Sequence, residues 1–136
     1  MKVKIEFNNR SIRNHKSNFT SAKGKPLDRV DTPFNLRSVL YKGLRLREYR
    51  GGSKHFIVIF YLKGQRTKPR VYTVGTFDDN RDIITGETIF GVKQCTDRLF
   101  KLVKEHCDER GHWIKDPNLT ISFSLVNKSI TVRDLI

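Results

Sequence analysis

The sequence predicts an α+β domain in which a three-stranded antiparallel sheet packs against one C-terminal α-helix. Three consecutive runs with strand-like patterns, separated by glycine-bearing turns, lie between residues 42 and 77. A segment with apolar residues at three-to-four spacing follows them. The chain has 136 residues, enough for one domain with a modest core. Its hydrophobic fraction of 37% is low, so we expect polar flanks around an ordered centre.

Residues 1–41 are predicted to form a flexible basic arm. Val3, Ile5 and Phe7 alternate with charged residues, a pattern typical of a short strand. The stretch 8–31 is rich in Asn, Ser, Lys, Arg and Gly and has no apolar period, which is typical of irregular structure. We therefore place the start of the compact domain at residue 42.

The three predicted strands cover residues 44–49, 55–62 and 70–76. The first alternates apolar and polar residues, and the second is a continuous run of β-branched and aromatic residues. The turns at 50–54 and 63–69 both contain glycine, and the second is very basic. Consecutive strands joined by short turns form an antiparallel meander.

A polar connection at 77–88 leads into the predicted helix, for which Thr88 is the expected N-cap and Gly111 the expected stop. The pair Asp116-Pro117 closes the domain, which we assign to residues 42–117. The helix has one apolar stripe, made of Ile89, Val92, Thr96, Leu99, Val103 and Cys107, with Phe100 alongside.

Residues 118–136 are predicted to be a linker that leads into a following domain. Residues 119–125 alternate apolar and polar side chains, which favours one extra C-terminal strand. Residues 129–136 read as the first turn of a helix, so we expect the chain to be a fragment of a longer protein.

Cys95 and Cys107 are the only two cysteines. Twelve residues along one helix separate them by about 18 Å, too far for a disulfide. Free thiols, together with an N-terminus that lacks a signal-peptide core, predict a cytoplasmic protein. No stretch is long and apolar enough to span a bilayer, so a membrane is a poorer partner than nucleic acid.

The charge of the chain favours a polyanionic partner. The formal net charge is +13 and the pI is about 10.1, and binding to phosphates would release counterions. The positive charge is concentrated in residues 42–77, where Glu48 is the only acid. In residues 78–110 acidic residues outnumber basic ones, so we expect the sheet rather than the helix to meet nucleic acid.

Alternation divides the strand residues between two faces. The face predicted to pack on the helix contains Leu44, Leu46, Phe56, Val58, Phe60, Leu62, Tyr72 and Val74. The opposite face contains Arg45, Arg47, Tyr49, Ile57, Ile59, Tyr61, Val71 and Thr73. A sheet of two or three strands fits the DNA major groove, where arginine reads guanine. The candidate DNA-binding residues are Arg45, Arg47, Tyr49, Lys54, Tyr61, Lys63, Arg66, Lys68, Arg70 and Thr73.

Several short motifs resemble one known family when taken together in order. They are Gly43-Leu44-Arg45-Leu46-Arg47, Gly52-Ser53-Lys54 with Phe56, Lys63-Gly64-Gln65-Arg66, the run from Tyr72 to Phe77, and Asp116-Pro117. This series, over about residues 40–117, resembles the N-terminal arm-type DNA-binding domain of phage integrases of the tyrosine recombinase family. Residues 131–136 are similar to the opening of the core-binding domain that follows in that family.

The resemblance implies a three-stranded sheet that docks into the major groove of arm-type sites during DNA integration and site-specific recombination. It also implies that the catalytic domain lies further along the chain and that other integrase subunits are partners. The residues themselves show no catalytic constellation, and none of the tyrosines has a neighbouring base. Neither the His and Cys spacings nor the run of aspartates at 78–82 match a zinc or calcium site. We therefore predict no cofactor, no metal and no enzymatic activity for this chain.

Two alternatives to duplex DNA binding stay open. Basic sheet-and-helix modules with exposed aromatic residues also bind RNA. A phage protein–protein adaptor could instead use Ile57 and Ile59 as its interface. For the N-terminal arm, we expect its basic residues to follow the DNA backbone or to enter the minor groove; they are Arg10, Arg13, Lys16, Lys23 and Lys25.

Overall fold

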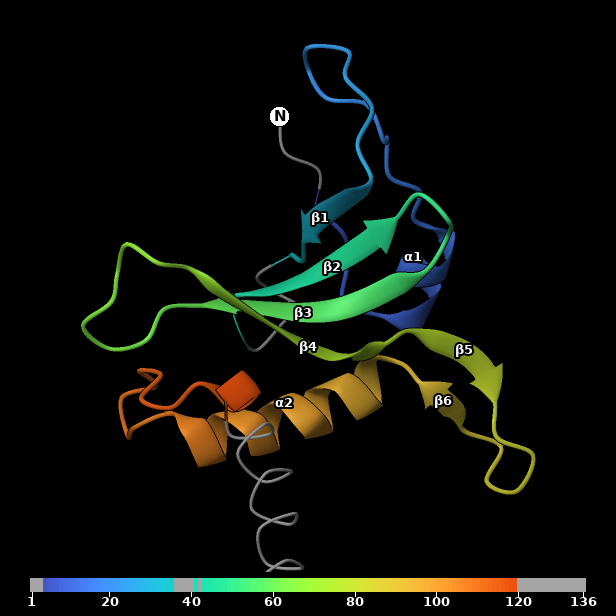
Figure 1. The fold of residues 1–136 in the computed structure, drawn as a ribbon. Coiled ribbons are helices and arrows are strands. Elements are labelled where there is room, and N and C mark those ends of the chain that lie inside the picture. The colour runs from blue at the N-terminus through green and yellow to red at the C-terminus, as the bar shows by residue number, and fades with distance from the viewer. Residues whose placement is uncertain (1–3, 36–40, 42, 120–136) are drawn as a thin grey trace, which may run out of the picture.

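The computed structural model describes residues 4–35, 41 and 43–119 and has α+β architecture (Figure 1). Four strands form one antiparallel sheet in the order β1-β2-β3-β4, and β5 and β6 form a separate two-stranded sheet. Along the chain the elements are α1 (Asn9–Asn14), β1 (Arg29–Pro33), β2 (Leu44–Tyr49), β3 (Lys54–Phe60), β4 (Arg70–Thr76), β5 (Asp78–Arg81), β6 (Thr88–Phe90) and α2 (Val92–His106).

The meander of β2, β3 and β4 was predicted from the sequence, but the sheet has four strands rather than three. The additional strand, β1, pairs antiparallel with β2, and Thr32 lies opposite Leu46. Thr32 is buried and Val30 is half-buried, so the strand has one inward face even though charged residues surround it in the sequence. This segment was expected to belong to an irregular arm.

The hydrophobic core lies between α2 and one face of the sheet, as the alternation of β2 and β3 predicted. In Figure 1 the helix runs beneath the sheet, and it contributes Cys95, Leu99 and Leu102. Leu62 and Tyr72 are half-buried and pack against the same cluster. The buried residues that the strands bring to the core are Leu44, Leu46, Phe56, Val58, Phe60 and Val74.

A β-bulge in β4 brings the small sheet against the core. Phe56 pairs with Gly75, whereas the next residue, Ile57, pairs with Thr73. A Cβ atom on Gly75 would collide with the ring of Phe90 in β6, so only glycine fits this position. The guanidinium group of Arg98 in α2 lies over the Phe90 ring, 4.8 Å from its centroid.

The segment between the sheet and α2 differs from the prediction of an irregular connection. Residues 88–90 form β6, which pairs with β5, so the helix begins at Val92 and Thr88 is not its N-cap. Ile89 consequently lies outside the helical stripe and is exposed. The helix ends at His106, and Gly111 lies beyond it in a turn with a φ of 84°.

Two long-range polar contacts hold the N-terminal segment against the domain. The side-chain oxygen of Asn9 accepts a hydrogen bond of 2.8 Å from the backbone N–H of Val92 and so caps α2. The ammonium group of Lys54 donates to the carbonyl oxygens of Ile12, Arg13 and His15 at 2.5, 3.1 and 2.7 Å. These contacts, with the complete burial of Ile12, correct the expectation of a flexible arm for residues 9–15.

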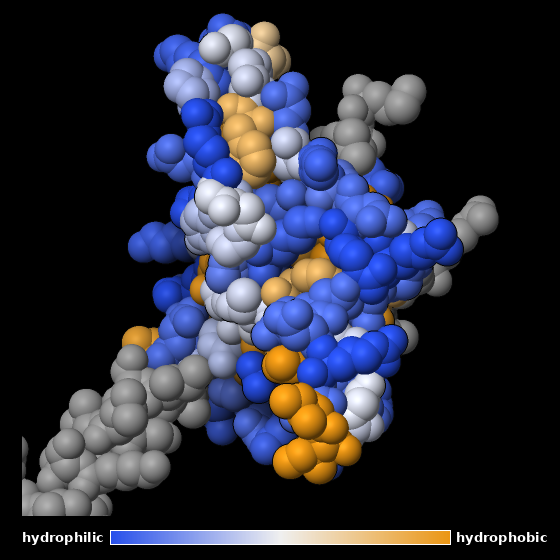
Figure 2. Space-filling view, turned by 90° about the vertical axis from the view of Figure 1, so that its right-hand side faces the viewer, coloured by the Kyte–Doolittle hydropathy of each residue, from blue (hydrophilic) through white to orange (hydrophobic). Residues whose placement is uncertain are grey.

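The hairpin of β5 and β6 presents two apolar side chains to solvent. Ile83 and Ile84 are 100% and 93% exposed at its tip, which forms the hydrophobic patch in the lower part of Figure 2. The tip is ordered, because the Asp82 carboxylate accepts hydrogen bonds from the backbone N–H groups of Ile84 and Thr85. These bonds hold the pKa of Asp82 below its ordinary value.

The predicted strand at 119–125, except for its first residue, and the predicted helical turn at 129–136 lie outside the described residues. Within the part of the chain that the structure describes, no helix has the length and hydropathy needed to cross a membrane.

Replacing Asn9 with alanine removes the cap of α2 and should lower the free energy of unfolding by about 1 kcal/mol. The matched control is Asn14→Ala, because Asn14 belongs to the same short helix and is exposed. Chemical denaturation of both variants measures the difference. Equal stability of the two variants would contradict the assigned capping role.

Candidate nucleic-acid interface

The strand register assembles one continuous surface on the side of the sheet opposite α2. Arg45 pairs with Ile57, which in turn pairs with Thr73, so these three side chains point to the same side of the sheet. We call this surface the open face. Its members are Arg29, Asp31 and Pro33 from β1, Arg45, Arg47 and Tyr49 from β2, His55, Ile57 and Ile59 from β3, and Val71, Thr73 and Thr76 from β4.

Arg47 is held in a fixed orientation on the open face. Its Nε and Nη2 donate to the two carboxylate oxygens of Asp31 at 2.7 and 2.9 Å. The hydrogen bonds from Arg47 to Asp31 raise the pKa of the guanidinium above its ordinary value. Two of its five N–H donors are engaged in this fork, Tyr49 makes a further hydrogen-bonding contact, and the side chain is 12% exposed. Asp31 thus orients Arg47 and neutralises part of its charge.

His55 supplies neutral hydrogen-bonding groups beside Arg47. Its ring nitrogens lie 3.0 Å from the Thr76 hydroxyl and 3.2 Å from the Ser53 hydroxyl. Burial, followed by the charge of Arg47, lowers the pKa of His55 below its ordinary value of 6.5, so the ring is neutral at pH 7. The ring of Tyr49 packs edge-on against His55 at 5.2 Å, which fixes the tyrosine against its neighbour.

The two isoleucines of the open face do not form an exposed apolar patch. Ile57 has 0% exposure, although its cross-strand neighbours on this side are Arg45 and Thr73. Ile59 and Arg45 are half-buried, whereas Thr73 and Val71 are exposed. On the open face, Asp31, Val71 and Thr73 are thus exposed, and the two arginines of β2 are half-buried between them.

A long basic loop, residues 61–69, continues from the end of the open face. Lys63, Arg66 and Lys68 are exposed in it, and Figure 1 shows the loop extending well beyond the rest of the sheet. Its base is fixed because the backbone N–H of Lys63 donates to the carbonyl of Trp113 at 2.8 Å. Gly64, with a φ of 84°, forms the turn. Tyr61, 46% exposed, stands at the start of the loop.

Lys54 and Arg70, the other two basic candidates, have their charged groups engaged on the opposite side of the sheet. Lys54 binds the carbonyl end of α1, and burial lowers the pKa of its ammonium group. Arg70 donates to the carboxylate of Asp116 at 2.9 Å and to the side-chain oxygen of Gln65 at 3.1 Å. Both contacts hold segments of the fold together. The structure therefore brings together the candidates on β2 and β4 and in the basic loop, but places these two apart from them.

Sequence reasoning missed Asp31 and His55 as members of the site. Asp31 was assigned to a turn because β1 was not predicted, and its pairing with Arg47 depends on that strand. His55 was placed on the second strand without a role. The alternation of the second strand was the signal that could have located His55, since it places His55 on the same side as Ile57.

The described residues suggest no metal site, because no group of three or more His, Cys, Asp or Glu residues is placed to hold an ion. Burial raises the pKa of the Cys95 thiol to about 12 and that of Cys107 to about 11. Both thiols are therefore protonated at neutral pH and poorly nucleophilic.

None of the protein-family models matches the chain, and comparisons with curated proteins and with solved structures likewise find no match. The function is therefore argued from the geometry and charge of the site itself.

Replacing Lys54 with methionine keeps the aliphatic stem but removes the ammonium that binds three carbonyl groups. We expect the free energy of unfolding to fall by about 1.5–3 kcal/mol. Lys63→Met is the control, because the Lys63 side chain is 66% exposed and its nearest carboxylate is 3.6 Å away. Thermal and urea unfolding should separate the two variants. If Lys54→Met is as stable as the control, the Lys54 ammonium does not stabilise the fold.

Proposed function

We propose that this protein binds double-stranded DNA by placing the open face in the major groove. The observation that carries the proposal is the position of Arg45, Arg47 and Thr73 on one face that α2 leaves uncovered, with the basic loop at its end. Arginines that face a groove can read guanine, and lysines beside it can bind phosphates.

The dimensions of the sheet support the major groove as its target. Neighbouring strands lie about 4.8 Å apart, so β2, β3 and β4 together span about 10 Å and the whole four-stranded sheet about 14 Å. In the proposed complex the three strands β2, β3 and β4 enter the groove and β1 lies at its edge. The major groove is about 12 Å wide and accommodates strands, whereas the minor groove is about half that width. The net charge of +13 supplies the attraction to phosphates that any such complex needs.

The positions of the tyrosines favour duplex DNA over single-stranded RNA. Single strands bind by stacking successive bases on exposed aromatic rings. Tyr49 is packed edge-on against His55, and Tyr72 is half-buried on the α2 side. Tyr61 is the tyrosine that is exposed beside the open face. A single exposed ring cannot stack several successive bases. The adaptor alternative loses support because Ile57 is buried.

We further propose that the domain serves a site-specific recombinase as its arm-type DNA-binding module in the cytoplasm, with other recombinase subunits as partners and the chemistry carried by a separate domain. The support is the ordered series of motifs and the structural need for their residues. Gly64 has a positive φ, Gly75 faces the Phe90 ring, and Asp116 binds Arg70. Each of these motif residues has a structural role in this fold, so the motif series is consistent with a domain of this architecture.

Placing a negative charge on the open face should weaken DNA binding strongly without unfolding the protein. Thr73→Glu serves this purpose, because Thr73 is exposed on β4. Thr85→Glu is the matched control at the tip of the acidic hairpin. We expect Thr73→Glu to raise Kd for a duplex at least tenfold and the control to change it by less than about twofold, since repulsion between like charges falls off with distance. Fluorescence anisotropy measures both. Equal effects would place the interface elsewhere.

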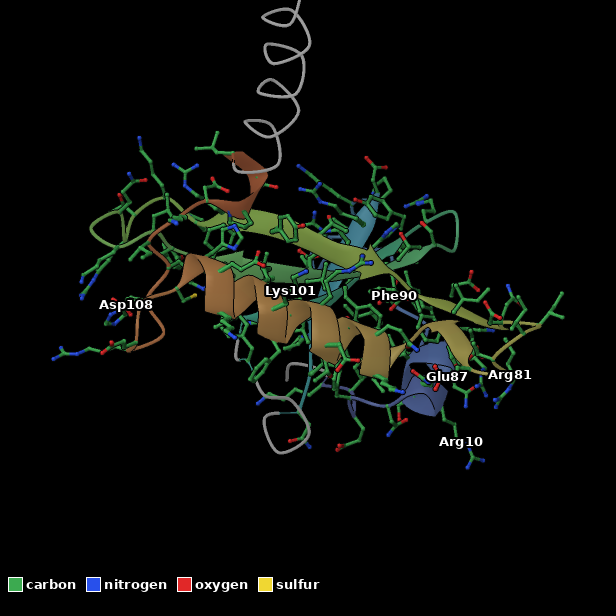
Figure 3. All side chains as sticks on the ribbon, turned by 90° about the horizontal axis from the view of Figure 1, so that it is seen from below. Arg10, Arg81, Glu87, Phe90, Lys101 and Asp108 are labelled. Carbon is green, nitrogen blue, oxygen red and sulfur yellow. The ribbon has the colours of Figure 1, made fainter. Side chains whose placement is uncertain are left out.

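The basic loop should contribute phosphate contacts that are visible in the salt dependence. Removing two contacts with Arg66→Ala and Lys68→Ala should reduce the slope of log K against log salt concentration by about 1.8. The charge-matched control is Lys101→Ala with Lys104→Ala, on the helix seen in front of the sheet in Figure 3. A larger loss of slope in the control would contradict the proposed orientation on DNA.

A further inference from the structure

We infer that the hairpin of residues 20–26, here called the N-terminal hairpin, is a second DNA-binding element that contacts phosphates outside the groove occupied by the sheet. The inference rests on the proposed function, because it takes the open face as the first contact. Figure 1 shows this hairpin standing out beyond β1, at the opposite end of the molecule from α2.

The N-terminal hairpin has a defined turn rather than the irregular structure expected of an arm. Thr20 and Pro26 form an antiparallel bridge at its base. The backbone N–H of Ser21 donates to the carbonyl of Lys25 at 2.8 Å, and the Ser21 hydroxyl accepts from the Lys25 N–H at 3.0 Å. Gly24 supplies the left-handed conformation that the turn needs, with a φ of 81°. Its two lysines are thus presented from a preorganised backbone.

Arg50, in the turn between β2 and β3, ties the base of this hairpin to the sheet. Its Nε donates to the carbonyl of Leu27 and its Nη2 to the carbonyl of Phe19, both at 3.2 Å. Its backbone N–H donates to the carbonyl of Asp28 at 3.0 Å. Arg50 is therefore a positioning residue, and it couples the orientation of the hairpin to that of the open face.

The charge of the hairpin fits phosphates. Lys23 and Lys25 are exposed, and the sequence contains no acidic residue between Glu6 and Asp28. Within the described part of the chain, no carboxylate lies within ion-pair distance of either ammonium group. A lysine ammonium is a compact point charge that binds phosphate oxygens, and phosphate contacts carry no direct sequence information. The hairpin therefore adds affinity rather than sequence reading.

The reach of the hairpin places its contacts beyond the central groove. The hairpin leads directly into β1, and Lys25 precedes Asp31 of the open face by six residues. At about 3.3 Å per extended residue this separation is at most about 20 Å. A major groove about 12 Å wide is narrower than this upper limit, so the lysines can reach the phosphates that flank it. Contacts at that reach would extend the covered DNA beyond the base pairs under the sheet.

The test measures salt-dependent affinity of Lys23→Ala with Lys25→Ala for duplexes of about 10 and about 22 base pairs, or about one and two helical turns. On the longer duplex we expect the salt slope to fall by about 1.8, the value for two lost phosphate contacts. On the shorter duplex, which extends only about 17 Å from its centre, we expect little change. Lys101→Ala with Lys104→Ala again controls for the loss of two charges. Thermal unfolding should be unaltered, because both hairpin lysines are exposed.

The outcomes separate this inference from the proposed function. If the hairpin variant binds like the parent protein while Thr73→Glu strongly weakens binding, the hairpin is not a contact and the sheet interface stands. An equal loss on both duplexes would place the lysines within the central groove and overturn the inferred position. If Thr73→Glu also leaves binding intact, the proposed function itself fails. Arg50→Met gives an independent test. It keeps both lysines in the sequence but releases the base of the hairpin, so the salt slope should fall in part on the longer duplex and not on the shorter one.

Discussion

One-sided burial is the constraint on which the rest of the structure depends. The helix α2 and the N-terminal segment cover one face of the four-stranded sheet, so alternate side chains of β2 and β3 must be apolar to fill that core. The intervening side chains then face away from the helix whatever their chemistry. Arg45, Arg47 and Thr73 share a surface because Leu44, Leu46 and Val74 are needed on the other side. The candidate interface is in this sense a consequence of the core.

The basic residues divide into those that hold the fold and those that face solvent. Lys54 binds the carbonyl end of α1, Arg50 holds the base of the N-terminal hairpin, and Arg70 pairs with Asp116. Their charged groups bridge oxygen atoms of segments that lie far apart in the sequence. Lys63 and Arg66, by contrast, extend from a loop whose base alone is anchored. The net charge therefore indicates the class of ligand. The position of the interface depends on which basic side chains the fold leaves accessible to solvent.

Periodicity was sufficient to predict β2, β3 and β4 and the division of their faces, because each depends on local pattern. It located α2 but misplaced its buried side, since Cys95 and Leu102 are buried whereas Phe100 is 70% exposed. It was not sufficient for α1 and β1, whose sequences are polar and whose stability comes from partners far along the chain. Asn9 caps a helix that starts 83 residues later, and such a contact leaves no local signal. The aspartates of β5 favoured a turn, yet tertiary pairing with β6 made them a strand. Likewise, the roles of Lys54 and Arg70 could not be read from their charge alone.

The central claim is that the face of the sheet opposite α2 binds duplex DNA. Titration of the ¹⁵N-labelled protein with a duplex, followed by amide chemical shifts at two salt concentrations, tests this claim residue by residue. We predict that the largest shifts occur at residues 45–49, 63–68 and 71–73 and that they weaken as salt rises. Shifts concentrated on α2, with the amides of β2 and β4 unchanged, would contradict the account.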